Sequence, residues 1–328
     1  MKILVIYTGG TIGSSVSGEY VAVDEAKKHQ LLEQIVNSRE DFKNVFFDTV
    51  NPYYILSENV TAATINCLAS CIRENMSRDY KGIIVLHGTD TVQYMAAAMD
   101  YMFADTKIPI LFASSNYVLE DERANGVTNF EAAADFILDQ GRPGCYIAYQ
   151  NHDKKVYIHR ATRVLPHLPL SDEIYSIFDQ YLGYYENGVY QENKAYKKGE
   201  STEEGLGVKM LSEDRSVQRI FSYPGMQLPS VFSDAEAVLM NTYHSGTLCN
   251  KTPHFEKFMK QLNRAGIPVF VVGATGETQY ESVKALDTDL HFLPPASPVA
   301  MYVKLWLLIN KEGDLTEMMQ IPMCEDLF

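Results

Sequence analysis

The sequence predicts an α/β protein, with a larger N-terminal domain whose mostly parallel sheet is flanked by helices and a smaller C-terminal α/β domain. Short apolar runs of strand length alternate with longer segments of helical period, which is the pattern of a parallel sheet covered by helices. At 328 residues the chain is long for one hydrophobic core. A polar stretch at residues 184–205 separates two regions of this alternation.

Strands are expected where apolar residues run together between turn signals. In the N-terminal region these runs are residues 2–7, 82–86, 108–113 and 145–148. In the C-terminal region they are residues 237–240 and 267–272. Helices are expected between the strands, at residues 58–74, 92–103, 130–138 and 255–264. After residue 205 the alternation is shorter, which predicts the smaller second domain.

The polar stretch is rich in Tyr, Glu, Lys, Asn and Gly, and it contains little that can bury an apolar face. We therefore expect a larger N-terminal domain at residues 1–185, a linker at 186–211 and a smaller C-terminal domain at 212–328.

The charge and the apolar runs exclude some classes of partner. The formal net charge is −14, and a surface of this sign repels phosphate backbones, so nucleic acid is not expected as a partner. No apolar stretch approaches the ~20 residues that span a bilayer, so no membrane partner is expected. The run at residues 2–7 is too short for a signal peptide, and the cytoplasm is the expected location.

The five cysteines do not predict disulfides, because an odd number in a chain of this length is unlike a disulfide framework. Cys67 and Cys71 are four residues apart and fall on one face of an expected helix. A metal site would need further ligands nearby, so buried core thiols are favoured. No metal or other cofactor is expected.

The first unusual loop is Thr8-Gly9-Gly10-Thr11-Ile12-Gly13, directly after the first expected strand. Paired glycines let the backbone turn sharply and approach a ligand closely. Taken alone, the loop is more typical of a tight turn with a capping threonine. It lacks the Lys-Ser/Thr of a P-loop and the G-x-G-x-x-G spacing of a dinucleotide site.

The second loop is His87-Gly88-Thr89-Asp90-Thr91, between an expected strand and an expected helix. Thr89 or Asp90 can cap that helix, and N–H groups at the turn can equally bind a developing oxyanion. His87 closes a buried strand, which favours a structural histidine. Both loops follow strands, and in open α/β sheets ligands bind beyond the carboxyl ends of strands.

Together the two threonine loops resemble those of the bacterial-type L-asparaginases, and the resemblance extends along most of the chain. The other matching segments are Gly18-Glu19-Tyr20, Ser57-Glu58, Ser114-Ser115-Asn116, Arg123-Ala124-Asn125-Gly126 with Asn129, and Ser297-Pro298-Val299-Ala300 with Lys304-Leu305. Asn125 stands where the family usually has Asp. The short N-terminus without a leader resembles the cytoplasmic type.

The resemblance implies an amidohydrolase that cleaves the side-chain amide of L-asparagine to L-aspartate and ammonia, with weaker action on glutamine. Thr11 would be the nucleophile, and Tyr20, carried by a lid at residues 14–21, would be its hydrogen-bond partner. Thr89 would act in the second, hydrolytic step.

The resemblance also assigns the substrate contacts. Backbone N–H groups of Gly10 and Thr89 would form an oxyanion hole. The ammonium of the substrate would be held by Asp90 and Glu58, and its α-carboxylate by Ser57. Gly88 and Ser115 are the remaining residues that we expect to line the substrate site.

One position departs from the family. The segment Arg160-Ala161-Thr162-Arg163 carries arginine where the family has a lysine that forms a triad with the second threonine and the aspartate. Lysine can exchange a proton, whereas arginine remains charged. We expect Arg163 to pair with Asp90 in a fork, which would preserve binding and slow the chemical step.

Two alternatives stay open. The arginine raises the possibility of a non-catalytic or specialised asparaginase-like protein that binds an amino acid. The other alternative is the related amidotransferase subunit of tRNA-linked glutamine synthesis. The acidic charge and the lack of an extra N-terminal domain disfavour it. The resemblance also implies a homodimer or homotetramer in which residues 243–247 of one protomer help to complete the site of a neighbour.

Overall fold

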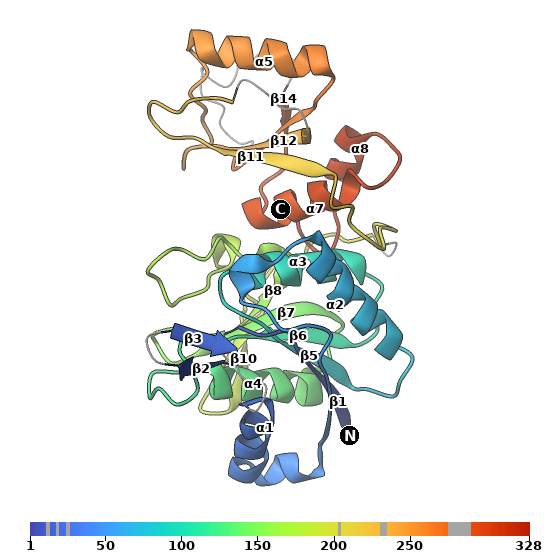
Figure 1. Cartoon of the computed structure of the whole chain (residues 1–328), viewed down its shortest axis with the longest axis vertical. Helices are drawn as coiled ribbons and strands as arrows, with labels where there is room; N and C mark the ends of the chain where they lie inside the picture. The colour runs from blue at the N-terminus through green and yellow to red at the C-terminus, as the bar shows by residue number, and fades with distance from the viewer. Residues whose placement is uncertain (11–13, 18–19, 24–26, 203–204, 230–234, 275–289) are drawn as a thin grey trace.

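The computed structural model describes residues 1–10, 14–17, 20–23, 27–202, 205–229, 235–274 and 290–328, with the backbone alone at 14–17, 20–23, 27–30 and 37–38 (Figure 1). Its large sheet has the strand order β10-β9-β8-β7-β6-β5-β1-β4. The strands are β1 (Lys2–Tyr7), β4 (Phe46–Val50), β5 (Gly82–Leu86), β6 (Pro109–Ala113), β7 (Gly144–Gln150), β8 (Val156–Arg160), β9 (Gly183–Glu186) and β10 (Val189–Glu192).

Strands β4, β1, β5, β6 and β7 run parallel to one another. The next three strands, β8, β9 and β10, each pair antiparallel with the strand before them in the sheet. Helices cover both faces of this sheet, with α2 (Ala62–Asn75) and α3 (Val92–Met102) on one face and α1 (Lys27–Ser38) and α4 (Gly126–Asp135) on the other (Figure 1). Alternate residues of each central strand face the two cores: Ile83 and Val85 pack on one side, and Ile84 and Leu86 on the other.

The smaller C-terminal unit has a parallel sheet of four strands in the order β11-β12-β13-β14. Its strands are β11 (Ser216–Phe221), β12 (Ala235–Asn241), β13 (Val269–Val272) and β14 (Leu290–Phe292). Helix α5 (Pro253–Ala265) packs on it through Phe255, Phe258 and Leu262. The chain then returns through α7 (Pro298–Leu308) and α8 (Leu315–Gln320), which lie between the two sheets in Figure 1. The predicted fold class is therefore confirmed.

The predicted strands and helices differ from the observed ones mainly at their ends, whereas six strands of the two sheets were not predicted: β4, β8, β9, β10, β11 and β14. Helix α2 begins four residues later than expected, because Thr61 caps it through a hydrogen bond from its backbone N–H to the Thr64 hydroxyl (2.8 Å). Residues Ser57–Asn59 form a separate 3₁₀ turn. Residues 136–138, expected in the helix after β6, continue α4 as a π-helical turn.

The stretch expected as a linker contains regular structure at its start. Strands β9 and β10 form a hairpin around Asn187 and Gly188, whose φ angles of 52° and 76° are the left-handed values that a tight hairpin turn needs. The large sheet thus ends at Glu192 and the small sheet begins at Ser216. The division into domains at residues 186–211 remains a proposal.

The five cysteines carry no disulfide. The expectation that Cys67 and Cys71 are buried is wrong: Cys67 is exposed and Cys71 is half-buried, because α2 buries the stripe that contains Ile65, Leu68 and Ile72 instead. Within the described ranges no helix combines the length and the apolarity needed to cross a membrane.

Candidate active site

The loops that follow β1 and β5 meet at the carboxyl edge of the large sheet. Strands β1 and β5 are adjacent and parallel, so the two threonine loops leave the sheet side by side. Thr8 holds this pairing beyond the strands, since its N–H (3.1 Å) and its hydroxyl (2.8 Å) both donate to the carbonyl oxygen of Leu86. The sequence prediction that both motifs lie at strand ends is thus matched by the topology.

The glycines of these loops are required by contact. A β-carbon on Gly10, where φ is 78°, would lie 2.4 Å from the Cα of Gly88. A β-carbon on Gly88 would lie 2.4 Å from the hydroxyl oxygen of Ser57. Three segments far apart in sequence therefore touch at this edge, and only glycine permits such an approach.

The backbone of Gly10 does not form the expected oxyanion hole. Its N–H donates to the carbonyl oxygen of Ile55 at 3.1 Å, and Ile55 in turn donates to Thr8 at 3.1 Å. This bridge ties the first loop to the segment that leads into Ser57. The assignment of the Gly10 N–H as an oxyanion donor is therefore wrong for this conformation, because its hydrogen bond is already made.

Two predicted residues are not placed by the structure. Thr11 lies outside the described residues, and Tyr20 begins β3 (Tyr20–Val23) with its side chain outside the description. The segment predicted as a lid forms an antiparallel pair, β2 (Ser14–Ser17) with β3, in which Ser17 lies opposite Tyr20. The roles of Thr11 and Tyr20 remain proposals.

Thr89 and Asp90 line a hollow of about 370 Å³ beyond the ends of β5, β6 and β7. Thr89 is half-buried and Asp90 is exposed. Asn116, Tyr149, His167 and Asp172 contribute to the same wall. A small open space lined by hydroxyl, amide and carboxylate groups can bind a small polar ligand.

Asn116 is held by a reciprocal pair with Asn125. The backbone N–H of Asn116 donates to the side-chain oxygen of Asn125 (3.0 Å), and the N–H of Asn125 donates to the side-chain oxygen of Asn116 (3.3 Å). The amide nitrogen of Asn125 also donates to the carbonyl oxygen of Gln150 (3.1 Å). Aspartate has no donor for this last bond when ionised, which accounts for asparagine at this position.

Of the other predicted substrate contacts, Ser57 is buried beneath Gly88, and Glu58 is exposed beside it in the same 3₁₀ turn. Thr91 fixes this turn by donating from its hydroxyl to the carbonyl oxygen of Ser57 at 2.9 Å. Ser115 is fully buried and its hydroxyl donates to the carbonyl oxygen of Tyr117 at 2.6 Å. The proton of the Ser115 hydroxyl is thus already used in a hydrogen bond, and the role of Ser115 in substrate binding remains a proposal.

Arg163 does not pair with Asp90, and that expectation is wrong. The guanidinium is fully buried and donates instead to the carbonyl oxygens of Glu325 (2.9 Å) and Lys197 (2.8 Å). It also lies over the rings of Tyr196 and Phe328, at 4.7 Å and 4.5 Å from their centroids. The partners at residues 325 and 328 are too distant in sequence for the local motif to indicate.

Two aromatic groups near the hollow have shifted pKa values because they are buried. Burial lowers the pKa of His87 to about 4, so the ring is neutral at pH 7, as expected of a structural histidine. Its Nδ1 lies 2.8 Å from the carbonyl oxygen of Gly88. Burial raises the pKa of Tyr149 to about 12, so this phenol keeps its proton.

His167 belongs to the hollow and sequence analysis missed it. It lies in the loop between β8 and β9, near the antiparallel half of the sheet, and contacts both Thr89 and Ser171. Neither periodicity nor a motif marks this loop. The only signal available was its composition, Pro166-His167-Leu168-Pro169, in a segment that no regular element claims.

The loop after β12 carries the residues expected to complete a neighbouring site. It closes on itself through hydrogen bonds between the backbones of Tyr243 and Thr247 (2.9 Å) and of Gly246 and Tyr243 (2.9 Å). It follows the carboxyl end of a strand of the small sheet, as predicted. Its part in an assembly remains a proposal.

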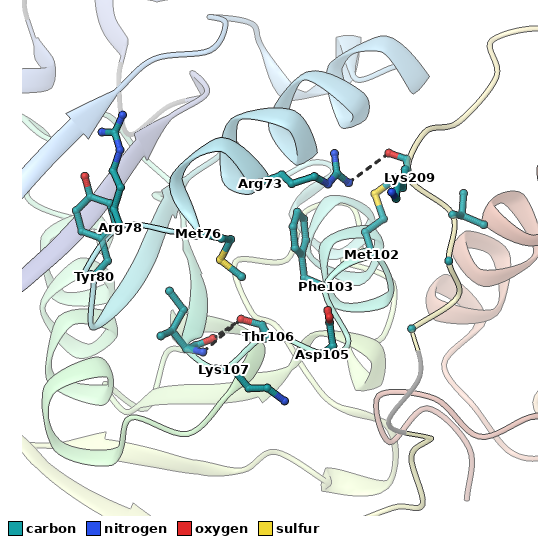
Figure 2. A pocket seen from close by; sticks show the side chains of 14 residues that line it. Arg73, Met76, Arg78, Tyr80, Met102, Phe103, Asp105, Thr106, Lys107 and Lys209 are labelled. Atoms are coloured by element: carbon teal, nitrogen blue, oxygen red, sulfur yellow. Dashed lines mark hydrogen bonds between the residues drawn. The ribbon is translucent and has the colours of Figure 1, made fainter.

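A larger hollow, of about 540 Å³, lies at the other edge of the large sheet (Figure 2). Figure 2 shows Arg73 reaching toward the carbonyl oxygen of Lys209 (3.4 Å), with Met76 and Phe103 around the same space. Its lining includes residues that precede β5 and β6, so it faces the amino ends of these strands. None of the residues predicted for the active site lines it, and ligands of open α/β sheets bind at the carboxyl ends.

A metal-binding cluster is not found among the described residues, where no three His, Cys, Asp or Glu side chains come together. The groups at the carboxyl edge are instead hydroxyls, carboxylates and one imidazole. Such a set can support nucleophilic and acid–base chemistry on an amide.

Residues 2–180, more than half of the chain, match the family model described as "Asparaginase, N-terminal". The chain belongs to the asparaginase family. This amidohydrolase family is the one that the two threonine loops resemble. Its matched region ends just before β9, so it covers both loops, the hollow and Arg163.

Solved asparaginases share the whole fold. The thermostable L-asparaginase from Thermococcus kodakarensis superposes with a TM-score of 0.80 at 22% identity, over 100% of this chain and 99% of that one. L-asparaginase I from Vibrio cholerae gives a TM-score of 0.77 at 22% identity, over the same shares. At such identities the likeness establishes the fold.

One similar protein of known sequence is named for a different activity. A glutamyl-tRNA(Gln) amidotransferase subunit from Thermoplasma volcanium is 30% identical over 270 residues, which are 80% of this chain and 64% of the relative. The chain thus spans less than two thirds of the length of that protein. The comparisons therefore establish the family, and the activity and substrate of this chain are matters for proposal.

Proposed function

We propose that this protein hydrolyses the side-chain amide of L-asparagine to L-aspartate and ammonia. The observation that carries the proposal is the contact between the two threonine loops, where Gly10 and Gly88 touch at the carboxyl edge of the sheet. The first loop continues into Thr11 and the second into Thr89 and Asp90. A site made of two threonine hydroxyls and a carboxylate suits a two-step displacement at an amide.

In the proposed reaction the Thr11 hydroxyl oxygen attacks the side-chain carbonyl carbon, and its proton passes to the departing amine. The C–N bond breaks and ammonia leaves, so the enzyme carries an ester on Thr11. Water then attacks this ester, which releases L-aspartate and returns the proton to the threonine oxygen. Tyr20 is the proposed partner of Thr11 in the first step, and Thr89 assists the water in the second.

The proposed substrate contacts use the charged ends of the amino acid. Asp90 and Glu58 are both exposed at the carboxyl edge and are the proposed partners of the ammonium. Ser57 is the proposed partner of the α-carboxylate. Thr89 is the remaining candidate donor of the oxyanion hole, because the Gly10 N–H is bonded to Ile55.

The experiment that tests this proposal compares L-asparagine with L-glutamine. Purified full-length protein is incubated with each amide, and ammonia and the free amino acid are measured together. We expect ammonia and L-aspartate in equal amounts, with L-asparagine giving the higher kcat/KM. Release of ammonia from neither amide contradicts the proposal.

The likeness to amidotransferase subunits favours a second candidate function, the release of ammonia for the amidation of glutamyl-tRNA(Gln). This candidate requires a preference for L-glutamine and a partner protein. The net charge of −14 disfavours direct contact with tRNA by this chain alone. A higher kcat/KM for L-glutamine in the same assay would support it over the first candidate.

A further inference from the structure

The hollow that holds Thr89 and Asp90 has one side chain that can carry a positive charge, His167, among its described lining residues. Two carboxylates, Asp90 and Asp172, lie in the same wall. In the neighbouring hollow, the guanidinium of Arg123 already pairs with Asp121 at 2.7 Å. Lys154 also lines that neighbouring hollow, so His167 is the group of this kind among the described residues that line the hollow with Thr89 and Asp90.

Both ring nitrogens of His167 face backbone carbonyl oxygens. Nε2 lies 2.8 Å from the carbonyl oxygen of Ser171, within the loop that carries the histidine. Nδ1 lies 3.4 Å from the carbonyl oxygen of Thr89, in the loop that follows β5. The ring also makes an edge-to-face contact with Tyr149, at a centroid distance of 6.1 Å and an interplanar angle of 75°. It is thus held between two loops and a buried aromatic ring.

A neutral imidazole carries one N–H and can donate to only one of these two carbonyl oxygens. The imidazolium donates to both, and it adds a positive charge beside Asp90 and Asp172. A ring that donates to both carbonyl oxygens must therefore carry both N–H groups. A charge-assisted hydrogen bond is also stronger than one between neutral groups.

We propose that His167 is a positioning residue of the active site, whose imidazolium fastens the loop at residues 165–172 to the turn that carries Thr89 and Asp90. The part of this proposal that concerns catalysis rests on the proposed amidohydrolase function. By fixing the Thr89 carbonyl, His167 sets the place of the Thr89 hydroxyl and of the Asp90 carboxylate on either side of it.

Arg163 cannot take this role in the described structure. Its guanidinium is bonded to the carbonyl oxygens of Glu325 and Lys197 and covered by two aromatic rings. The side chain that faces the Thr89 turn is instead that of His167, four residues further along the loop. There the backbone N–H of Leu165 donates to the carbonyl oxygen of Tyr175 at 2.9 Å.

The test uses three variants of the full-length protein. His167→Gln has no charge, His167→Lys restores a charge with three donors, and His254→Gln removes an exposed histidine of α5 as the matched control. Steady-state kinetics with L-asparagine give kcat and KM separately. Hydrogen–deuterium exchange of peptides covering residues 87–91 and 165–172 reports the two loops without any need for activity.

We expect His167→Gln to lower kcat at least tenfold, to raise KM, and to speed exchange in both peptides. His167→Lys should recover most of kcat and slow the exchange again, and His254→Gln should match the wild type. Unchanged exchange and kcat in His167→Gln would overturn the proposal. Faster exchange with unchanged kcat would overturn the link to catalysis. A kcat of His167→Lys that does not exceed that of His167→Gln would overturn the need for a positive charge.

The same experiment separates this inference from the proposed function. If the wild type releases no ammonia from either amide but His167→Gln still loosens both loops, the positioning role stands and the amidohydrolase proposal fails. If the wild type is active and His167→Gln leaves the loops and the rate unchanged, the function stands and the positioning role fails.

Discussion

Gly10 and Gly88 lie so close that a β-carbon on Gly10 would be 2.4 Å from the Cα of Gly88, although 77 residues separate them in the sequence. Each glycine precedes a threonine of the proposed site. The contact fixes the distance between the two loops by backbone alone, which no side-chain rearrangement can alter. The spacing of the two threonines is therefore a property of the backbone.

We predict that Gly88→Ala disrupts the site. The new β-carbon would meet the hydroxyl oxygen of Ser57 at 2.4 Å and its Cβ at 2.6 Å, so one loop has to move. We expect the free energy of unfolding to fall by about 1–3 kcal/mol, measured by urea denaturation. Adding Ser57→Gly removes both clashing atoms and should restore much of this loss. Gly205→Ala, whose β-carbon has a nearest neighbour at 3.8 Å, is the control.

Thr11→Ala should abolish hydrolysis of L-asparagine while the protein stays folded, because it removes the proposed nucleophile. Thr89→Val should also be severe, since it removes a hydroxyl with little change in volume. Both are measured by ammonia release, with circular dichroism to follow folding. Thr316→Val, in α8, is the matched control. A Thr11→Ala variant that retains more than a few per cent of kcat would exclude Thr11 as the nucleophile.

Arg163→Lys should destabilise the protein and should not raise kcat. Lysine cannot reproduce the two divergent bonds to the carbonyl oxygens of Glu325 and Lys197 or the contacts with two rings. We expect a loss of about 2–4 kcal/mol in the free energy of unfolding, since buried charged hydrogen bonds are lost. Arg142→Lys, whose guanidinium is partly exposed and 3.6 Å from Glu325, should cost less. An increase in kcat for Arg163→Lys would contradict the observed arrangement.

The contribution of two buried histidines to stability should fall as the pH drops below about 6.5. Burial lowers the pKa of His87 to about 4 and that of His159 to about 3, from the ordinary value of 6.5. The unfolded chain therefore binds protons in this range while the folded chain does not, so each histidine's contribution is present above pH 6.5 and is lost as the pH falls.

The slope of the free energy of unfolding against pH tests this prediction. Each buried histidine should contribute up to about 1.4 kcal/mol per pH unit between pH 6 and pH 4.5. Replacing His159 by Asn should make the dependence of unfolding free energy on pH shallower by about that amount. The same change at the exposed His254 should leave the slope unaltered. Equal slopes for the wild type and His159→Asn would show that His159 is protonated in the folded state.

We also predict a homodimer or homotetramer in which the loop at residues 243–247 contributes to a neighbouring site. Analytical ultracentrifugation of the purified protein, combined with activity at matched concentrations, measures this directly. Substitution of His244 by Ala should lower activity without changing the sedimentation coefficient. A fully active monomer would refute the prediction.

The central strands could be predicted from the sequence because they are buried on both faces. Residues 2–7 and 82–86 are continuous apolar runs, and β1 and β5 occupy those residues. The strands that were missed include the edge strands β4 and β10, and also β9 and β8, which lie further in. In β9 and β10 tyrosines stand among polar residues beside a hairpin turn, so their composition resembles that of a linker.

The candidate site was only partly predictable, for a related reason. Thr89, Asp90 and Ser57 follow motifs that can be recognised along the chain, whereas His167 is brought to Thr89 by an irregular loop. The partners of Arg163 come from residues 196–197 and 325–328, and no local pattern indicates a contact over that separation. Sequence motifs therefore located the candidate residues Thr89, Asp90 and Ser57, and tertiary contacts decided which other side chains stand beside them.

Contacts made by residues 324–326 indicate how fragments of the protein should behave. Asp326 accepts from Tyr101 of α3 (2.8 Å) and from Lys304 (2.9 Å), while Thr162 donates to the carbonyl oxygen of Cys324 (2.7 Å). A fragment containing only residues 1–192 would expose these buried partners, so it should not fold by itself. Cleavage between β10 and β11 should instead yield two pieces that stay bound and co-elute until denaturant separates them. Separately expressed halves should then complement each other when they are refolded together.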